Sequence, residues 1–137
     1  MADDPDRLFI KKTDRSIYDE ILENSDLKVR SNIDIFLLAT IIGFKKGQRI
    51  SIKGSKDGYV LTYTIKEEDR ILMNAIAIYE TKNEEVIENQ KEVFEIVEEY
   101  AHAGLTYLRE MVFDKERGSF LKKFESYLRD IIPSKLT

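Results

Sequence analysis

The sequence contains no cysteine, which excludes disulfides, thiolate-bound zinc, iron–sulfur clusters and thiol catalysis. Its single histidine, His102, excludes a metal site built from several histidines. No apolar run approaches the roughly 20 residues of a membrane-spanning helix. The acidic N-terminus lacks the hydrophobic core of a secretory signal. These absences predict a cytoplasmic protein of a reducing compartment, with no membrane partner.

Glycine and proline are also scarce, since the 137 residues include six Gly and two Pro and no linker-like stretch. Hydrophobic residues reach 42% and charged residues 35%, a composition typical of a folded chain. The length fits one domain, which we assign to residues 8–133, preceded by a disordered acidic tail at residues 1–7. The formal net charge of −4 does not indicate a polycation that binds nucleic acid.

Apolar side chains recur at helical spacing through most of the chain. The segment from Ile35 to Ile42 is apolar nearly all round, which is typical of a helix buried on every side. Gly104 interrupts the longest periodic segment at a cost of about 1 kcal/mol relative to alanine, so we expect a close helix–helix approach or a bend there. Helices are expected at about 15–23, 31–43, 68–80, 89–113 and 119–132.

Two kinds of strand signal complete the predicted fold. Residues 8–12 form a short run typical of an edge strand. Residues 49–53 and 59–65 alternate on either side of a Gly-rich loop, which predicts a hairpin at about 48–65. We therefore expect a mainly α (α+β) fold, with about five helices around a buried central helix and one small antiparallel β-hairpin.

Seven glutamates lie between Glu84 and Glu99 against a single lysine. Glu88, Glu92, Glu95 and Glu99 recur at helical spacing and form what we call the acidic ridge. Such a ridge is usually the solvated face of a long helix; its functional interpretation is a docking surface for a partner. A metal site is the weaker hypothesis, because all the carboxylates come from one helix.

Five basic residues lie around the predicted hairpin and carry the charge opposite to that of the acidic ridge. We call them the basic segment: Lys45, Lys46, Arg49, Lys53 and Lys56. They could contact a protein partner or the phosphates of a nucleic acid. A winged-helix arrangement would need a polar, basic face on the preceding helix, and residues 33–44 offer only Asp34 and Thr40. Sequence-specific recognition of a major groove is therefore not predicted.

The remaining question from the residues alone is catalysis. His102 follows Glu98 and Glu99 closely, and a histidine beside carboxylates can act as a general base. A lone histidine on a helix flank is more often simply half-exposed. No phosphate-binding loop, nucleophile elbow, metal motif or dinucleotide fingerprint occurs. We expect no enzymatic activity, no cofactor and no metal site.

Three segments together resemble a known family: residues 32–44 (NIDIFLLATIIGF), 68–78 (EDRILMNAIAI) and 98–105 (EEYAHAGL). In this order and spacing they resemble the small proteins called Dnd system-associated protein 4, encoded beside prokaryotic DNA phosphorothioation and restriction genes. The likeness covers about residues 30–112, and its most specific part contains Glu98, Glu99, Tyr100 and Gly104. Family members carry Asn and Gly in place of His102 and Ala103, so no role is transferred to that pair. The resemblance implies an accessory protein of a prokaryotic defence locus that acts through larger partners, without assigned catalytic residues.

Three hypotheses follow. The first is a non-enzymatic accessory or adaptor subunit of an antiphage or DNA phosphorothioation-linked system, bound to a larger protein of a defence complex. Segregated acidic and basic surfaces would orient that partner, or could join copies head to tail as a homo-oligomer.

The second is a nucleic-acid-binding accessory protein that uses the basic segment with Lys122, Lys123 and Arg129, and it predicts salt-dependent affinity. The third, a hydrolase with glutamate ligands, predicts stabilisation by a divalent metal.

Overall fold

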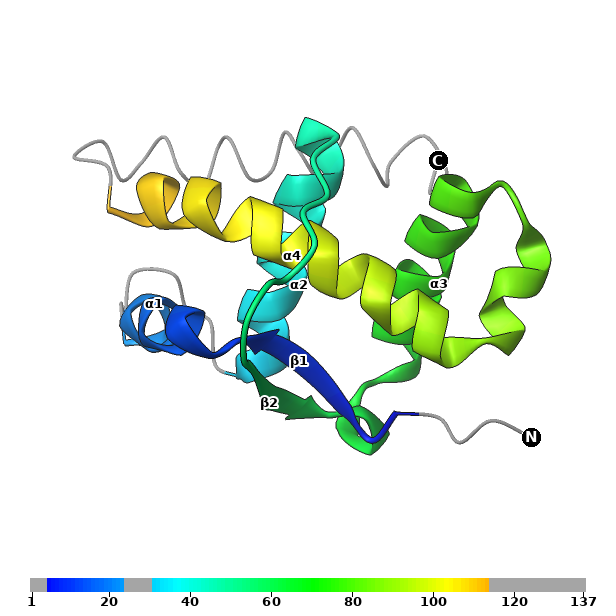
Figure 1. The fold of residues 1–137 in the computed structure, drawn as a ribbon, viewed down its shortest axis with the longest axis horizontal. Helices are drawn as coiled ribbons and strands as arrows, with labels where there is room; N and C mark the ends of the chain where they lie inside the picture. Colours follow the sequence, from blue (N-terminus) through cyan, green and yellow to red (C-terminus); the bar gives the residue numbers. More distant parts are fainter. Residues whose placement is uncertain (1–4, 24–30, 114–137) are drawn as a thin grey trace.

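The computed structural model describes residues 5–23 and 31–113, and these form four α-helices and a small sheet (Figure 1). The helices and strands are α1 (Arg15–Leu22), α2 (Asn32–Lys46), α3 (Glu67–Thr81), α4 (Gln90–Val112), β1 (Arg7–Lys11) and β2 (Lys56–Leu61). Short 3₁₀ helices, η1 (Lys12–Asp14), η3 (Thr62–Thr64) and η4 (Glu84–Glu88), precede α1, α3 and α4. The mainly α fold with a small antiparallel sheet is therefore confirmed. The fifth expected helix, with Lys122, Lys123 and Arg129, lies outside the described residues.

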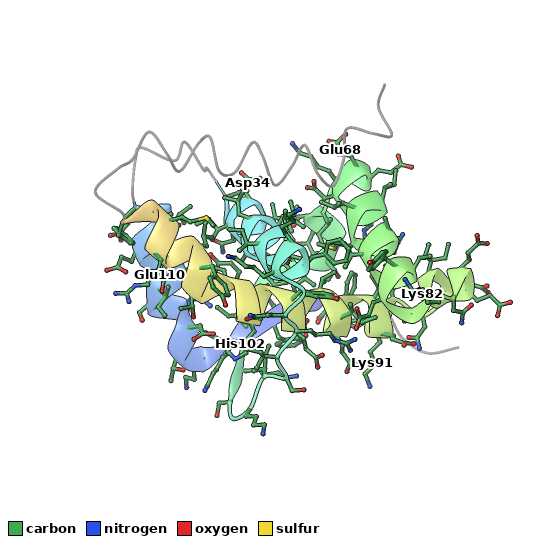
Figure 2. All side chains as sticks on the ribbon, turned by 90° about the horizontal axis from the view of Figure 1, so that it is seen from above. Asp34, Glu68, Lys82, Lys91, His102 and Glu110 are labelled. Atoms are coloured by element: carbon green, nitrogen blue, oxygen red, sulfur yellow. The ribbon has the colours of Figure 1, made fainter. Side chains whose placement is uncertain are left out.

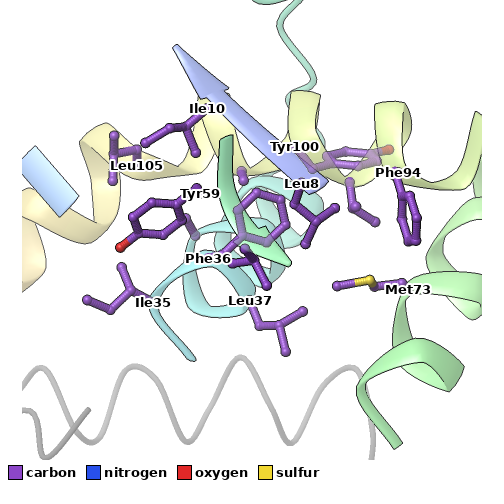
Figure 3. Close-up of a cluster of buried hydrophobic side chains, with 14 of the residues drawn as sticks. Leu8, Ile10, Ile35, Phe36, Leu37, Tyr59, Met73, Phe94, Tyr100 and Leu105 are labelled. Atoms are coloured by element: carbon purple, nitrogen blue, oxygen red, sulfur yellow. The ribbon is translucent and has the colours of Figure 1, made fainter. Parts of the chain in front are cut away.

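The centre of the fold is the crossing of α2 and α4. Helix α2 is apolar on nearly every side, and Ile35, Phe36 and Ile42 are fully buried. Figure 3 shows Phe36 among side chains from the sheet, α3 and α4, where Leu8 and Met73 are also fully buried. Burial of one such side chain stabilises the fold by about 1.5–3 kcal/mol. Because these side chains come from the sheet, α2, α3 and α4, their burial holds those elements together.

Two glycines allow α2 and α4 to cross in backbone contact. A Cβ atom added to Gly104 would lie 1.9 Å from the carbonyl oxygen of Ala39, and one added to Gly43 would lie 2.0 Å from that of Tyr100. Next to this contact, the Thr40 hydroxyl donates to the Phe36 carbonyl at 2.8 Å. The close approach expected at Gly104 is confirmed.

The sheet has a different partner strand from the one expected. Strand β2 pairs antiparallel with β1, in a register that sets Leu8 opposite Val60, with an irregularity after Leu8. Residues 49–53 are not a strand, so the expected pairing with 59–65 is wrong. The amide of Ile50 instead donates to the Glu99 carbonyl of α4 at 3.2 Å, and the Ile50 side chain is 49% exposed. Strand β1 buries Leu8 and Ile10, so it offers β2 a more apolar neighbour than residues 49–53 would.

The end of the expected acidic tail is held by the fold. Thr62 donates from its amide to the Asp6 carbonyl at 2.9 Å and from its hydroxyl to the Pro5 carbonyl at 2.8 Å. Residues 5–7 therefore belong to the folded part, and β1 begins at Arg7. Within residues 5–23 and 31–113, no helix has the length and apolar character needed to cross a bilayer.

Candidate functional site

The basic segment begins where α2 ends and then crosses α4. Gly47 ends α2 in the left-handed conformation, with a φ of 68°, and redirects the chain. The chain beyond it passes over α4 (Figure 1), where Ile50 is bound to the Glu99 carbonyl. The Tyr107 hydroxyl donates to the Gln48 side chain at 3.1 Å. Part of the basic segment is therefore fixed against α4.

Arg49 is bound by two carboxylates from different helices. Its Nε donates to Glu99 Oε1 at 2.6 Å, and its Nη1 donates to Glu80 Oε2 at 2.7 Å. Glu80 also accepts a hydrogen bond from the Tyr100 hydroxyl. The bonds from Tyr100 and Arg49 hold the pKa of Glu80 below its usual value, while burial and Glu80 raise that of Tyr100. The charge of Arg49 is thus compensated within the fold.

The four lysines of the basic segment are exposed. Lys46 lies with its Nζ 4.7 Å from the ring centre of Tyr107, in a cation–π contact. At the start of β2, next to Lys56, Asp57 pairs with Arg15 at 3.0 Å. The other three lysines are Lys45, Lys53 and Lys56. The basic segment therefore consists of four exposed lysines and one arginine whose charge is compensated by two carboxylates.

The acidic ridge runs from η4 along α4 and reaches the basic segment. Glu88, Glu92 and Glu95 are exposed, whereas Glu99 is partly covered by its bond to Arg49. An open depression of ≈ 360 Å³ lies between the two surfaces. Its lining consists of Arg49, Asn89, Lys91, Glu92, Glu95, Ile96 and Glu99. The two charged surfaces, expected to be segregated, therefore meet at the Arg49–Glu99 pair.

The segment 98–104, which carries the most specific part of the family likeness, joins α4 to four other parts of the fold. Glu98 binds the β1 backbone and Glu99 binds Arg49. Tyr100 binds Glu80 of α3, and Gly104 packs against α2. Glu80 is the member of this network that the sequence did not reveal, because nothing in its helical pattern marks its distant partners.

Glu98 is a buried carboxylate. Its side chain is 5% exposed, and Oε2 accepts the amide of Phe9 at 2.9 Å. Burial raises the pKa of Glu98 to about 7, against the opposing effects of the Phe9 amide and Lys56. The irregularity in β1 follows Leu8, so Glu98 binds the first amide beyond it. A carboxylate at this position also hinders another strand from pairing with that edge of β1.

His102 binds Asp14 rather than either neighbouring glutamate. Its Nδ1 lies 2.9 Å from Asp14 Oδ2, and both side chains are mostly buried. Figure 2 labels His102 on α4, and Asp14 is the residue that precedes α1, so the contact joins α4 to the start of α1. Among residues 5–23 and 31–113, no three acidic, histidine or cysteine side chains are grouped so as to hold a metal ion.

Comparison with known proteins places these features in a family. A family model described as DNA sulphur modification system-associated protein 4 matches residues 11–127. The match includes α1 to α4 and segment 98–104. Searches of curated proteins and of solved structures returned no match.

Proposed function

The chain belongs to the DNA sulphur modification system-associated protein 4 family, and we propose that it acts there as a non-enzymatic accessory subunit that binds a larger protein. The partner is a protein of the same prokaryotic DNA phosphorothioation-linked defence locus, and the complex is cytoplasmic. The observation that carries this proposal is the pairing of Arg49 with Glu80 and Glu99 beside an exposed acidic ridge.

This pairing favours a protein partner over a nucleic acid. Arg49 is the central cation of the basic segment, and its charge is compensated by two carboxylates. Glu88, Glu92 and Glu95 extend the negative surface beside it, and negative side chains repel the phosphates of a nucleic acid. A basic surface on a protein would instead be attracted to the ridge and oriented by the neighbouring lysines.

The use of segment 98–104 also supports an accessory role. Glu98, Glu99, Tyr100 and Gly104 each join α4 to another part of the fold, and each is occupied by a structural contact. These residues, which carry the most specific part of the family likeness, therefore stabilise the fold. The side chains left to bind a partner are the exposed ones on that fold, such as those of the acidic ridge.

Reversing the charge of the exposed ridge is expected to weaken partner binding strongly. The triple variant Glu88→Lys, Glu92→Lys, Glu95→Lys should weaken the complex by about 100-fold, because attraction to a basic surface becomes repulsion. The chain would be co-expressed with each larger protein of its locus, and the affinity of any complex measured by titration calorimetry. The thermal midpoint of the free variant should change little, since all three side chains are exposed.

A matched control changes the net charge equally at a distance from the ridge. Asp19, Glu23 and Glu110 are exposed on α1, just after it and on α4, and their replacement by lysine should leave the affinity unchanged. Equal loss in both triple variants would show a dependence on net charge alone and would contradict a ridge-specific contact. Tighter binding of nucleic acid by the ridge variant, with no protein complex formed by the native chain, would favour the nucleic-acid alternative.

A further inference from the structure

Helix α3 turns one side to solvent, and that side carries two large apolar side chains. Ile71 is 60% exposed and Tyr79 is 61% exposed, with the exposed Ala75 midway between them. The Tyr79 ring contacts Phe44 edge to face, and Lys82 lies over the ring, yet most of its surface stays open. Large apolar side chains gathered in one exposed stripe are typical of a protein contact surface.

This α3 stripe is symmetric about Ala75. Ile71 and Tyr79 lie four residues before and after it, and Glu68 and Lys82 lie seven residues before and after it. Because a helix returns to the same face after four and after seven residues, Glu68, Ile71, Ala75 and Tyr79 share one face of α3. Lys82 follows the end of α3 in the left-handed conformation, with a φ of 57°, and its Nζ lies 3.8 Å from the ring centre of Tyr79, so its charge is held at the Tyr79 end of the stripe. All five side chains are exposed, and Figure 2 labels the two charged ends of the stripe.

We propose that the α3 stripe is the interface of a homodimer, in which α3 packs antiparallel against α3 of a second copy about a two-fold axis at Ala75. In this arrangement Ile71 of each copy meets Tyr79 of the other, and Glu68 of each copy meets Lys82 of the other. The small side chain of Ala75 allows the helices to approach closely at the axis. A two-fold contact requires a surface that is complementary to itself, and the order acidic, apolar, small, apolar, basic meets this requirement.

The size of the contact sets the expected affinity. A single helix from each copy buries less than the roughly 1,200 Å² of a stable interface, so we expect a dissociation constant of about 1–100 μM. The α3 stripe and the acidic ridge consist of different side chains, so each can be substituted without changing the other. Self-association and partner binding can therefore fail independently.

The first test is sedimentation equilibrium of the full chain over about 1–300 μM, a range that brackets this affinity. The native chain is expected to show a monomer–dimer equilibrium. Ala75→Arg sets two like charges at the axis and should raise the dissociation constant at least about 100-fold. Thr106→Arg, at an exposed position of α4, is the matched control and should leave it unchanged.

A charge exchange tests the antiparallel arrangement itself. E68K and K82E should each weaken the dimer about tenfold, because each sets like charges together across the axis. In an equal mixture of the two variants, a heterodimer pairs opposite charges at both contacts and should recover to within about threefold of the native affinity. Position 68 lies in the first turn of α3 and position 82 just after its end, about 20 Å away, so this recovery cannot arise within one chain.

A chain that is monomeric at every concentration would overturn the proposal, and so would a dimer unaffected by Ala75→Arg. Failure of the mixed variants to associate would overturn the antiparallel arrangement. A monomeric chain whose binding to a larger protein is lost with Ala75→Arg would assign the stripe to that protein instead of a second copy. Circular dichroism of each variant separates these outcomes from loss of folding.

Discussion

Gly104→Ala is expected to destabilise the protein by about 3 kcal/mol or more, although alanine is the better helix former by about 1 kcal/mol. The added methyl group would lie 1.9 Å from the Ala39 carbonyl oxygen and 2.6 Å from the Gly43 amide nitrogen. Both are backbone atoms of α2, so neither can turn aside as a side chain would. Relief requires α2 and α4 to separate, which loosens the core around Phe36.

Thermal unfolding followed by circular dichroism measures this effect, and the midpoint should fall by about 10 °C or more. Gly43→Ala should act in the same direction, because its methyl group would meet the Tyr100 carbonyl oxygen at 2.0 Å. Thr106→Ala serves as the control at an exposed position of α4. A Gly104→Ala protein as stable as the native chain would contradict the backbone contact between α2 and α4.

Glu98→Gln is expected to stabilise the protein at alkaline pH. Burial raises the pKa of Glu98 to about 7 from its ordinary value of 4.5, so between these pH values the folded chain holds a proton that the unfolded chain releases. Stability therefore decreases as pH rises through this window, by up to about 3 kcal/mol above pH 7. Glutamine carries no charge and keeps an oxygen for the Phe9 amide, so the variant should gain about 1–3 kcal/mol at pH 8.5 and little at pH 5.

Chemical denaturation of both proteins between pH 5 and 8.5 gives the free energy of unfolding that this prediction requires. Glu95→Gln, an exposed neighbour on α4, is the matched control and should not alter the pH dependence. If Glu98→Gln leaves the slope against pH unchanged, the buried carboxylate is not the group responsible. If it destabilises the protein equally at both ends of the range, the charge of Glu98 is needed by the fold.

The helices were predictable because their signal is local. Expected segments at 31–43, 68–80 and 89–113 correspond closely to α2, α3 and α4, since each carries a run of apolar residues at helical spacing. The sheet was predicted with the wrong partner because strand pairing is not local. Alternation at residues 49–53 resembles a strand, yet this segment gives a backbone amide to α4 while β2 pairs with distant β1.

Contacts between the charged surfaces were also not predictable from local sequence patterns. Positions of the acidic ridge and the basic segment follow from the sequence, but their contact does not. Arg49 lies 31 residues from Glu80 and 50 residues from Glu99, and no periodic pattern connects positions so far apart. Gly104 was more informative, because a glycine inside a strongly periodic helix has a cost that only packing offsets.

The most direct test of the accessory role is co-purification of the tagged full chain from cells that express its DNA sulphur modification locus, with and without nuclease. A protein that acts by binding a larger partner predicts that one larger protein is retained in a fixed ratio after nuclease treatment. The ridge variant should lose this protein, and the control triple variant should keep it. Recovery of nucleic acid alone, or loss of every partner after nuclease, would contradict a protein-binding role.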